Sequence, residues 1–180
     1  IIFTSGGTEA DNMAIVGAVE SYGLTHVIST QIEHHAVTHT IEHLDAAGKI
    51  EAIWLTVDEK GNIDLEELRT HLQAHPKSLV TLMHGNNKIG TLHDLEAIGA
   101  LCREHEVLFH SDTVQTMGHF AYDLATLPVD MMSASAHKFY GPKGVGFLYL
   151  RKGVKLPSLI MGGSQERDHR AGTENVPGIM

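Results

Sequence analysis

Four polar clusters hold the side chains that could carry out chemistry, and each follows an apolar run. In the first, Thr4-Ser5-Gly6-Gly7-Thr8-Glu9 leads into a helical pattern. Gly7 would let the backbone approach a ligand, Thr8 adds a hydroxyl, and the free N–H groups of a helix N-terminus attract a phosphate. Alternatively, the segment is a plain glycine turn in which Thr8 caps the helix, because it matches neither common glycine-rich phosphate motif.

The second cluster continues the apolar run Leu108-Phe109-His110 with Ser111-Asp112-Thr113-Val114-Gln115. A carboxylate directly after a buried strand loses its hydration and needs a partner. For Asp112 that partner is either the N-terminus of a helix that it caps or a protonated ring nitrogen of a cofactor.

The third cluster, Ser135-Ala136-His137-Lys138, lies between an apolar strand pattern and the turn Gly141-Pro142-Lys143-Gly144. Its small neighbours predict that the Lys138 amine is partly desolvated, which would make it a nucleophile. The alternative is a surface lysine on a tight turn.

The fourth cluster, His84 to Gly90, contains the adjacent amides Asn86 and Asn87. Such amides suit a turn, and they also supply donors for a ligand oxygen.

Taken together, the clusters predict a site for pyridoxal 5'-phosphate. Gly7 and Thr8 would cradle the phosphate, Asp112 would pair with the pyridinium nitrogen, and Lys138 would form a Schiff base. The carboxylate matters because it raises the pKa of the ring nitrogen and so keeps the ring an electron sink.

Strand-like and helix-like patterns alternate along the chain and must position these clusters. Strands are predicted at residues 1–4, 26–29, 51–57, 78–83, 107–110, 130–135 and 145–150, and helices at 9–22, 35–47, 64–72 and 94–105. Asp64, followed three residues later by Glu67, predicts a capping box. The alternation indicates an α/β fold, a three-layer αβα arrangement with a mainly parallel sheet that binds ligands beyond the carboxyl ends of its strands.

The composition fits a soluble globular domain. The chain has 180 residues, of which 42% are hydrophobic and 19% charged, and its formal net charge is −9. Because its cations are not clustered, we expect no nucleic-acid partner, and no apolar run has membrane-spanning length. The lone cysteine, Cys102, can form no internal disulfide, which favours a reducing compartment.

Six segments, in this order along the chain, carry a family resemblance. They are Phe3 to Ala10, Glu33-His34-His35-Ala36-Val37, Met83 to Gly90, Asp112 to Gln115, Ser135 to Gly144 and Arg170 to Asn175. Together they resemble the cysteine desulfurase family of the NifS/IscS type, in the class V aminotransferase group of fold-type I pyridoxal-phosphate enzymes. One such segment would carry little weight, but six in the family's order are specific.

The resemblance implies a role around the cofactor ring for each matching residue. Lys138 would hold the cofactor as an internal aldimine and then move the proton of the substrate α-carbon. Asp112 would pair with the pyridinium nitrogen, while Gln115 would hydrogen-bond the phenolic oxygen, with Asn87 on the same side. His34 would stack on the ring face and assist proton transfer.

The other matching residues would hold the phosphate. Thr8, Ser135 and His137 would bind it, helped by the backbone at Gly7. Thr173 would reach the phosphate of a neighbouring subunit, which implies a homodimer with sites at its interface.

The implied activity is that of a cytoplasmic cysteine desulfurase. L-cysteine would be converted to L-alanine, and its sulfur would pass to an enzyme cysteine as a persulfide. A sulfur-acceptor or iron–sulfur scaffold protein would then take the sulfur, for cluster assembly or thiolation. The alternatives are another class V enzyme, such as a selenocysteine lyase or an aminotransferase, and a fragment that binds the cofactor without turnover.

Both ends of the sequence predict that it is the interior of a longer protein. It starts on Ile1-Ile2-Phe3 without an initiator Met or a basic leader, so no signal peptide is expected, and it stops at Met180 with no terminating helix. Residues 1–180 are thus expected to be the pyridoxal-phosphate-binding large domain, without the N-terminal segment and the C-terminal small domain of the full enzyme.

Departures from the family pattern concern the rim of the site and the nucleophile. Lys88 stands where an acid is usual, which would alter the rim, and Ala136 replaces a glycine, a change we expect to be tolerated. The family's nucleophilic cysteine and its substrate-carboxylate arginine lie downstream of the Arg170 segment, outside this sequence. Cys102 lies in a helical Leu-Cys-Arg-Glu context and is expected to be a buried structural thiol.

Fourteen histidines invite a metal hypothesis. His35, His39 and His43 share one face of a predicted helix at a spacing that binds zinc or nickel. Because no acid or cysteine is placed to complete a site, we predict a solvated polar face and no metal.

Overall fold

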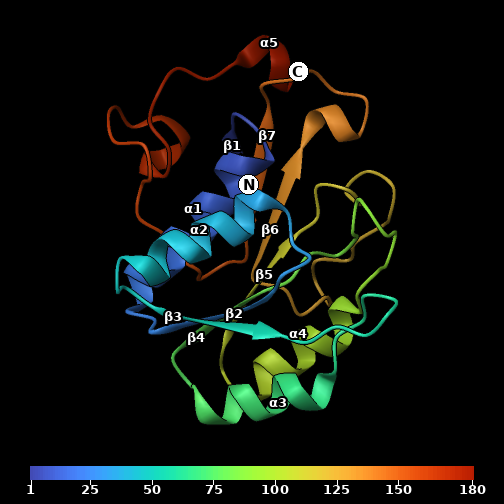
Figure 1. Cartoon of the computed structure of the whole chain (residues 1–180). Helices are drawn as coiled ribbons and strands as arrows, with labels where there is room; N and C mark the ends of the chain where they lie inside the picture. The colour runs from blue at the N-terminus through green and yellow to red at the C-terminus, as the bar shows by residue number, and fades with distance from the viewer.

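The computed structural model describes all 180 residues and has three layers, with one sheet between two layers of helices (Figure 1). Its strands are β1 (Ile2–Thr4), β2 (His26–Thr30), β3 (Glu51–Leu55), β4 (Ser78–Thr81), β5 (Leu108–Asp112), β6 (Met131–Ser135) and β7 (Gly146–Leu150). Its α-helices are α1 (Gly7–Tyr22), α2 (His35–Ala46), α3 (Leu65–Ala74), α4 (Leu95–Glu104) and the short α5 (Val176–Ile179). The predicted three-layer α/β fold is confirmed.

The sheet has the strand order β1-β7-β6-β5-β4-β2-β3. Strands β2 to β6 pair in parallel, whereas β7 runs antiparallel to both of its neighbours, β1 and β6. Strand β1 therefore points the same way as the parallel strands. As a result, the carboxyl ends of β1, β2, β4, β5 and β6 share one edge of the sheet, and each of the four polar clusters lies at or directly after the end of one of these strands.

Both faces of the sheet are covered, and the strand sequences explain why. Adjacent residues of a strand point to opposite faces. In β2 and in β4 two consecutive residues are fully buried, Val27 with Ile28 and Leu79 with Val80, and in each pair the two residues belong to different hydrophobic clusters. Strands that are apolar on both faces are typical of a parallel sheet between two helical layers.

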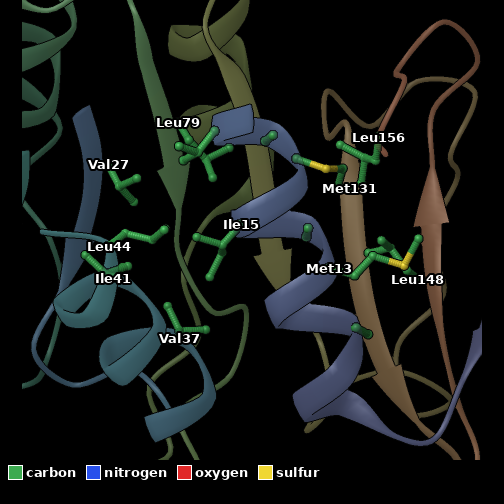
Figure 2. Close-up of a cluster of buried hydrophobic side chains, with 14 of the residues drawn as sticks. Met13, Ile15, Val27, Val37, Ile41, Leu44, Leu79, Met131, Leu148 and Leu156 are labelled. Atoms are coloured by element: carbon green, nitrogen blue, oxygen red, sulfur yellow. The ribbon is translucent and has the colours of Figure 1, made fainter. Parts of the chain in front are cut away.

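Helices α1 and α2 cover one face, and α3 and α4 cover the other (Figure 1). Figure 2 shows the first cluster, in which Ile15 of α1 lies on the side of Ile41 and Leu44 of α2, whereas Met13 lies beside Leu148 of β7. Burial of one such side chain stabilises the fold by about 1.5–3 kcal/mol. Helix α1 therefore rests on a large apolar contact, which fixes its N-terminus at the edge of the sheet.

Most element boundaries lie within two residues of the prediction, and two differences bear on function. Helix α1 begins at Gly7 rather than Glu9, so Gly7 and Thr8 belong to its first turn. Strand β5 extends to Asp112, because Asp112 pairs with Ser133 of β6. Asp112 is thus the last residue of a buried strand and does not follow it.

The predicted capping box at α3 is wrong. The carboxylate of Asp64 does accept a hydrogen bond from the Glu66 N–H, at 2.9 Å. Glu67, however, does not return to Asp64, because its carboxylate accepts hydrogen bonds from the N–H and the hydroxyl of Thr56, at 3.1 and 2.6 Å. Glu67 therefore joins α3 to the end of β3.

None of the helices combines the length and the apolar character that crossing a membrane requires.

Candidate functional site

A cavity of about 240 Å³ opens at the carboxyl edge of the sheet. Nine of the ten predicted site residues line it: Gly7, Thr8, His34, Asn87, Asp112, Gln115, Ser135, His137 and Lys138. They come from the start of α1, the N-cap of α2, the last residues of β5 and β6, and the segments that follow β4, β5 and β6. The fold thus brings the four polar clusters into one site.

Thr173 is the predicted residue that does not line this cavity. It is exposed and lies in a separate hollow of about 90 Å³, together with Thr4, Ser5 and Arg170. Its predicted contact with a neighbouring subunit stays a prediction.

One end of the cavity is suited to an anion. Helix α1 starts after Gly6, and no side chain caps it, so its first N–H groups have no intrahelical partner and carry the positive end of the helix dipole. Thr8 lies inside the first turn, and the alternative that it caps the helix is wrong. Beside it, the Ser135 hydroxyl lies 2.9 Å from His137 Nδ1, and an adjoining hollow adds the cation Lys143.

Gly7 is required by packing as well as by any ligand. A Cβ atom at this position would lie 2.5 Å from Cγ2 of Val114, in the segment after β5. Only a residue without a side chain lets the start of α1 lie this close to the residues that follow Asp112. The anion-binding end and the acidic floor of the cavity are adjacent for this reason.

Asp112 forms that floor and is 5% exposed. Its Oδ1 accepts a hydrogen bond from the Val114 N–H at 2.8 Å. The carboxylate thus holds its own turn, a role close to the capping alternative, while it still lines the cavity. Burial raises the pKa of Asp112, and the Val114 N–H, His34 and Lys138 oppose that shift. A cation in the cavity would have Asp112 as its counter-ion.

Lys138 ends a short 3-10 turn, Ala136–Lys138, and lines the cavity. The prediction that its amine is desolvated is wrong, because the Lys138 side chain is exposed. Ala136 is buried, and the fold accommodates its methyl group beside Gly141, which has no Cβ to meet it.

His34 has a structural role and a cavity-lining one. It is the N-cap of α2, and its Nδ1 accepts a hydrogen bond from the Ala36 N–H at 3.1 Å. In the neutral ring the proton is then on Nε2, since the accepting nitrogen cannot also be a donor. His34 therefore presents a donor to the cavity that it lines.

The two adjacent amides have different roles. Asn86 is buried, donates to the Ile32 carbonyl at 2.8 Å and accepts from the Lys88 and Ile89 N–H groups. It therefore holds the loop together, whereas Asn87 lines the cavity. The side chain of Lys88 lies outside the cavity lining.

Three residues that line the cavity were not predicted: Asp11, Met83 and Val114. Asp11 follows Thr8 by three positions, which places both on one face of α1. An acidic residue within an otherwise apolar stripe of that helix was the available signal.

Cys102 is a buried residue of α4 and is far from being a reactive thiol. Burial and the charge of Asp130 raise the pKa of Cys102. The expectation of a buried structural thiol is confirmed. His35 and His39 stack, with ring centroids 4.6 Å apart, and no group of three or more histidine, cysteine or acidic side chains is arranged to hold a metal ion.

Comparison with known proteins agrees with the motifs. The chain is 50% identical over 183 aligned positions to a putative cysteine desulfurase IscS 1 of Bacillus subtilis and 48% identical to a cysteine desulfurase IscS of Dictyoglomus turgidum. All of this chain is covered, but only 48% and 46% of those two proteins. The chain thus spans about half the length of these relatives.

Solved structures give the same result. A NifS-like protein matches with a TM-score of 0.93 and 42% identity, over 99% of this chain and 50% of its own. A structure described as SspA in complex with cysteine matches with a TM-score of 0.93 and 36% identity, over 99% of this chain and 52% of its own. The predicted resemblance to cysteine desulfurases of the NifS/IscS type is therefore confirmed.

The family model of the class V aminotransferases matches residues 1–180, the whole sequence. With the fold, the cavity and the relatives in agreement, the chain belongs to the aminotransferase class-V family.

Proposed function

We propose that residues 1–180 are the pyridoxal-phosphate-binding large domain of a cysteine desulfurase, with an N-terminal segment and a C-terminal small domain outside this sequence. The observation that carries the proposal is the joint presence in one cavity of Lys138, Asp112 and the uncapped N-terminus of α1. The similarity to cysteine desulfurases over the whole chain supports it.

The cavity residues fit pyridoxal 5'-phosphate. The unpartnered N–H groups of α1, with Thr8, Ser135 and His137, are suited to its phosphate. Asp112 is suited to the protonated ring nitrogen, because this buried carboxylate lines the cavity and has only one hydrogen bond of its own. Gln115 and Asn87 offer donors to the oxygen on the ring.

When bound, pyridoxal phosphate withdraws electrons from the α-carbon of an amino acid substrate. Lys138 would supply the amine that holds the cofactor and would take and return the proton of the substrate α-carbon. His34 lines the same cavity, and its Nε2–H is free. Its Nδ1 accepts a hydrogen bond from the Ala36 N–H, which fixes the orientation of the imidazole. Asp112 would keep the proton on the ring nitrogen of the cofactor, because a close anion stabilises the charged form.

We propose L-cysteine as the substrate and L-alanine as the product. An enzyme thiolate attacks the substrate sulfur, the Cβ–S bond breaks, and the thiol becomes a persulfide while the carbon fragment, after protonation, leaves as alanine. The reaction needs no other oxidant or reductant. Because Cys102 is buried away from the cavity, we assign the thiol to the part of the protein outside these residues.

The acceptor of the persulfide sulfur would be a sulfur-acceptor or iron–sulfur scaffold protein, and the enzyme would work in the cytoplasm as a homodimer. In that dimer, Thr173 would bind the phosphate in the site of the partner. A selenocysteine lyase or an aminotransferase is not favoured, because the relatives carry the name cysteine desulfurase.

The test uses the full-length protein with pyridoxal phosphate. Borohydride reduction followed by mass spectrometry should find the cofactor covalently attached to Lys138, and L-cysteine with a thiol reductant should yield equal amounts of alanine and sulfide. Lys138→Ala should lose both the label and the activity, whereas Lys60→Ala, a change at an exposed lysine outside the cavity, should keep both. A label that persists in Lys138→Ala, or transamination without sulfide release, would overturn the proposal.

A further inference from the structure

Asp112 is not the only acid at the floor of the cavity. Asp11, on the adjacent face of α1, also lines the cavity and is 1% exposed. Its Oδ1 atom is buried without a hydrogen-bond partner. A charged carboxylate with a buried oxygen that accepts no hydrogen bond is costly, so the site favours either a cation beside Asp11 or a proton on it.

His110 is the nearest candidate cation, and its surroundings exclude that role. Its Nε2 lies 3.6 Å from Asp11 Oδ1. Both ring nitrogens already have hydroxyl partners, Thr81 Oγ1 at Nδ1 and Ser133 Oγ at Nε2, each at 2.8 Å. Burial lowers the pKa of His110 to about 3, so the ring is neutral at physiological pH. The contact with Asp11 is not an ion pair.

Burial raises the pKa of Asp11, and the two charged groups that shift it further are both acids. Asp112 of β5 and Glu33, in the loop before α2, both raise its pKa further, in addition to burial, and only the Ser133 hydroxyl opposes them. The charged form of Asp112 has more support than that of Asp11, because Asp112 accepts a backbone hydrogen bond and lies close to His34 and Lys138. Of two neighbouring acids, the one with fewer donors and cations around it is the more easily protonated, and here that acid is Asp11.

If the proposed function holds, the difference between the surroundings of Asp11 and Asp112 indicates a role for Asp11. We propose that Asp11 is a positioning residue that remains protonated at the floor of the cavity, so that Asp112 alone supplies the negative charge that faces the cofactor ring. The protonated ring nitrogen of the cofactor is then balanced by one carboxylate, that of Asp112. The neutral Asp11 carboxyl group packs beside the hydrogen-bonded pair His110 and Ser133.

The proton on Asp11 can be detected without any cofactor. Infrared spectra of the full-length protein, freed of pyridoxal phosphate and held at neutral pH, should contain the C=O stretch of a protonated carboxyl group. The Asp11→Asn variant should lose one such band, and Asp45→Asn, at an exposed acid, should lose none. Glu33→Gln identifies the separate contribution of Glu33, whose pKa burial also raises. Unchanged bands in Asp11→Asn would overturn the proposal.

The binding of pyridoxal phosphate tests the charge assignment. An asparagine copies a protonated aspartate, so Asp11→Asn should keep the Kd within about threefold of the wild-type value, whereas Asp11→Ala should weaken binding by about tenfold. Asp112→Asn, which removes the ionised partner, should weaken it by tenfold or more. If Asp11→Asn weakens binding as much as Asp112→Asn, or if Asp11→Ala has no effect, the proposal is wrong.

The two proposals fail in different ways. Wild-type protein that binds no pyridoxal phosphate would refute the proposed function, and the infrared bands would still report the proton on Asp11. Should Asp11→Asn not fold, an infrared titration of Glu33→Gln decides the matter, because with Glu33 removed a protonated-carboxyl band must still persist well above the ordinary pH range of aspartate ionisation.

Discussion

Arg170 donates two hydrogen bonds to Glu9, from Nε to Oε1 at 2.7 Å and from Nη2 to Oε2 at 3.2 Å. Glu9 lies in the first turn of α1 and also accepts a hydrogen bond from the Ser5 N–H at 2.8 Å. The side chains are only 20% and 11% exposed, so this bidentate pair is better shielded from solvent than a surface salt bridge. It joins the segment that carries Thr173 to the first turn of α1, at the end of the cavity that is suited to an anion.

We expect Arg170→Lys to loosen this segment, because a lysine cannot make the two-pronged contact. Affinity for pyridoxal phosphate should fall by about tenfold, and limited proteolysis should cut residues 164–175 sooner. Arg69→Lys is the matched control, since Arg69 pairs with Glu104 on an exposed surface. Equal protease resistance of Arg170→Lys and the wild type would contradict the tethering role.

The same pair predicts a dependence of stability on pH. Burial alone would raise the pKa of Glu9, but the hydrogen bonds from Arg170 and Ser5 prevail and lower it from 4.5. A depressed carboxyl pKa stabilises the fold above the unfolded-state value, and that contribution is lost as the pH falls through the folded-state value. The difference in unfolding free energy between wild type and Glu9→Gln should therefore shrink below pH 4.5. A difference that is constant from neutral to acidic pH would argue against it.

Asp112→Asn should reduce turnover about 10²-fold or more, because the ring nitrogen would lose the anion that keeps it protonated. Steady-state alanine formation at saturating pyridoxal phosphate measures the effect, and saturation separates it from weaker cofactor binding. Asp45→Asn, which removes an exposed acid, should retain the wild-type rate. A near-normal rate in Asp112→Asn would rule out its pairing with the ring.

The sequence predicted the site well where a polar side chain lies at the end of a strand. Lys138, Asp112 and Asn87 each follow or end a buried strand, and parallel strands bring their carboxyl ends to one edge. The consecutive apolar residues Val27 and Ile28 also indicated a strand covered on both sides, and in the structure they are buried on opposite faces. Predicting the strands was sufficient here, because in a parallel sheet every residue at the end of a strand lies at the same edge.

Contacts between distant segments could not be read in this way. The sequence marks Asp11 only as an acid within an apolar helix stripe, and its proximity to His110 depends on how the fold packs α1 against β5. Glu67 matches a capping box, yet Thr56 from the end of β3 competes for its carboxylate. The exposure of Lys138 depends on what covers the turn after β6, which its small neighbours in sequence do not determine.

His34 allows the structural and the chemical roles of one side chain to be separated. His34→Ala removes the cap of α2 and should cost about 1 kcal/mol of unfolding free energy. His34→Asn keeps a capping acceptor, so its stability should be close to that of the wild type. Both variants lack the imidazole and should lose about 10²-fold in turnover. Normal turnover in a stable His34→Asn variant would show that the histidine only caps the helix.

Cys102 provides the sharpest test of where the sulfur goes. It is 1% exposed, and burial raises the pKa of its thiol, so an alkylating reagent should leave Cys102 unmodified in the native protein and label it only after unfolding. Cys102→Ala should cost about 1 kcal/mol of stability through the space left in the core and should still release alanine from L-cysteine. Cys102→Ser should cost more, because its hydroxyl would be buried in an apolar cluster. Loss of alanine formation in a folded Cys102→Ala variant would mean that this thiol, and not one outside the 180 residues, receives the sulfur.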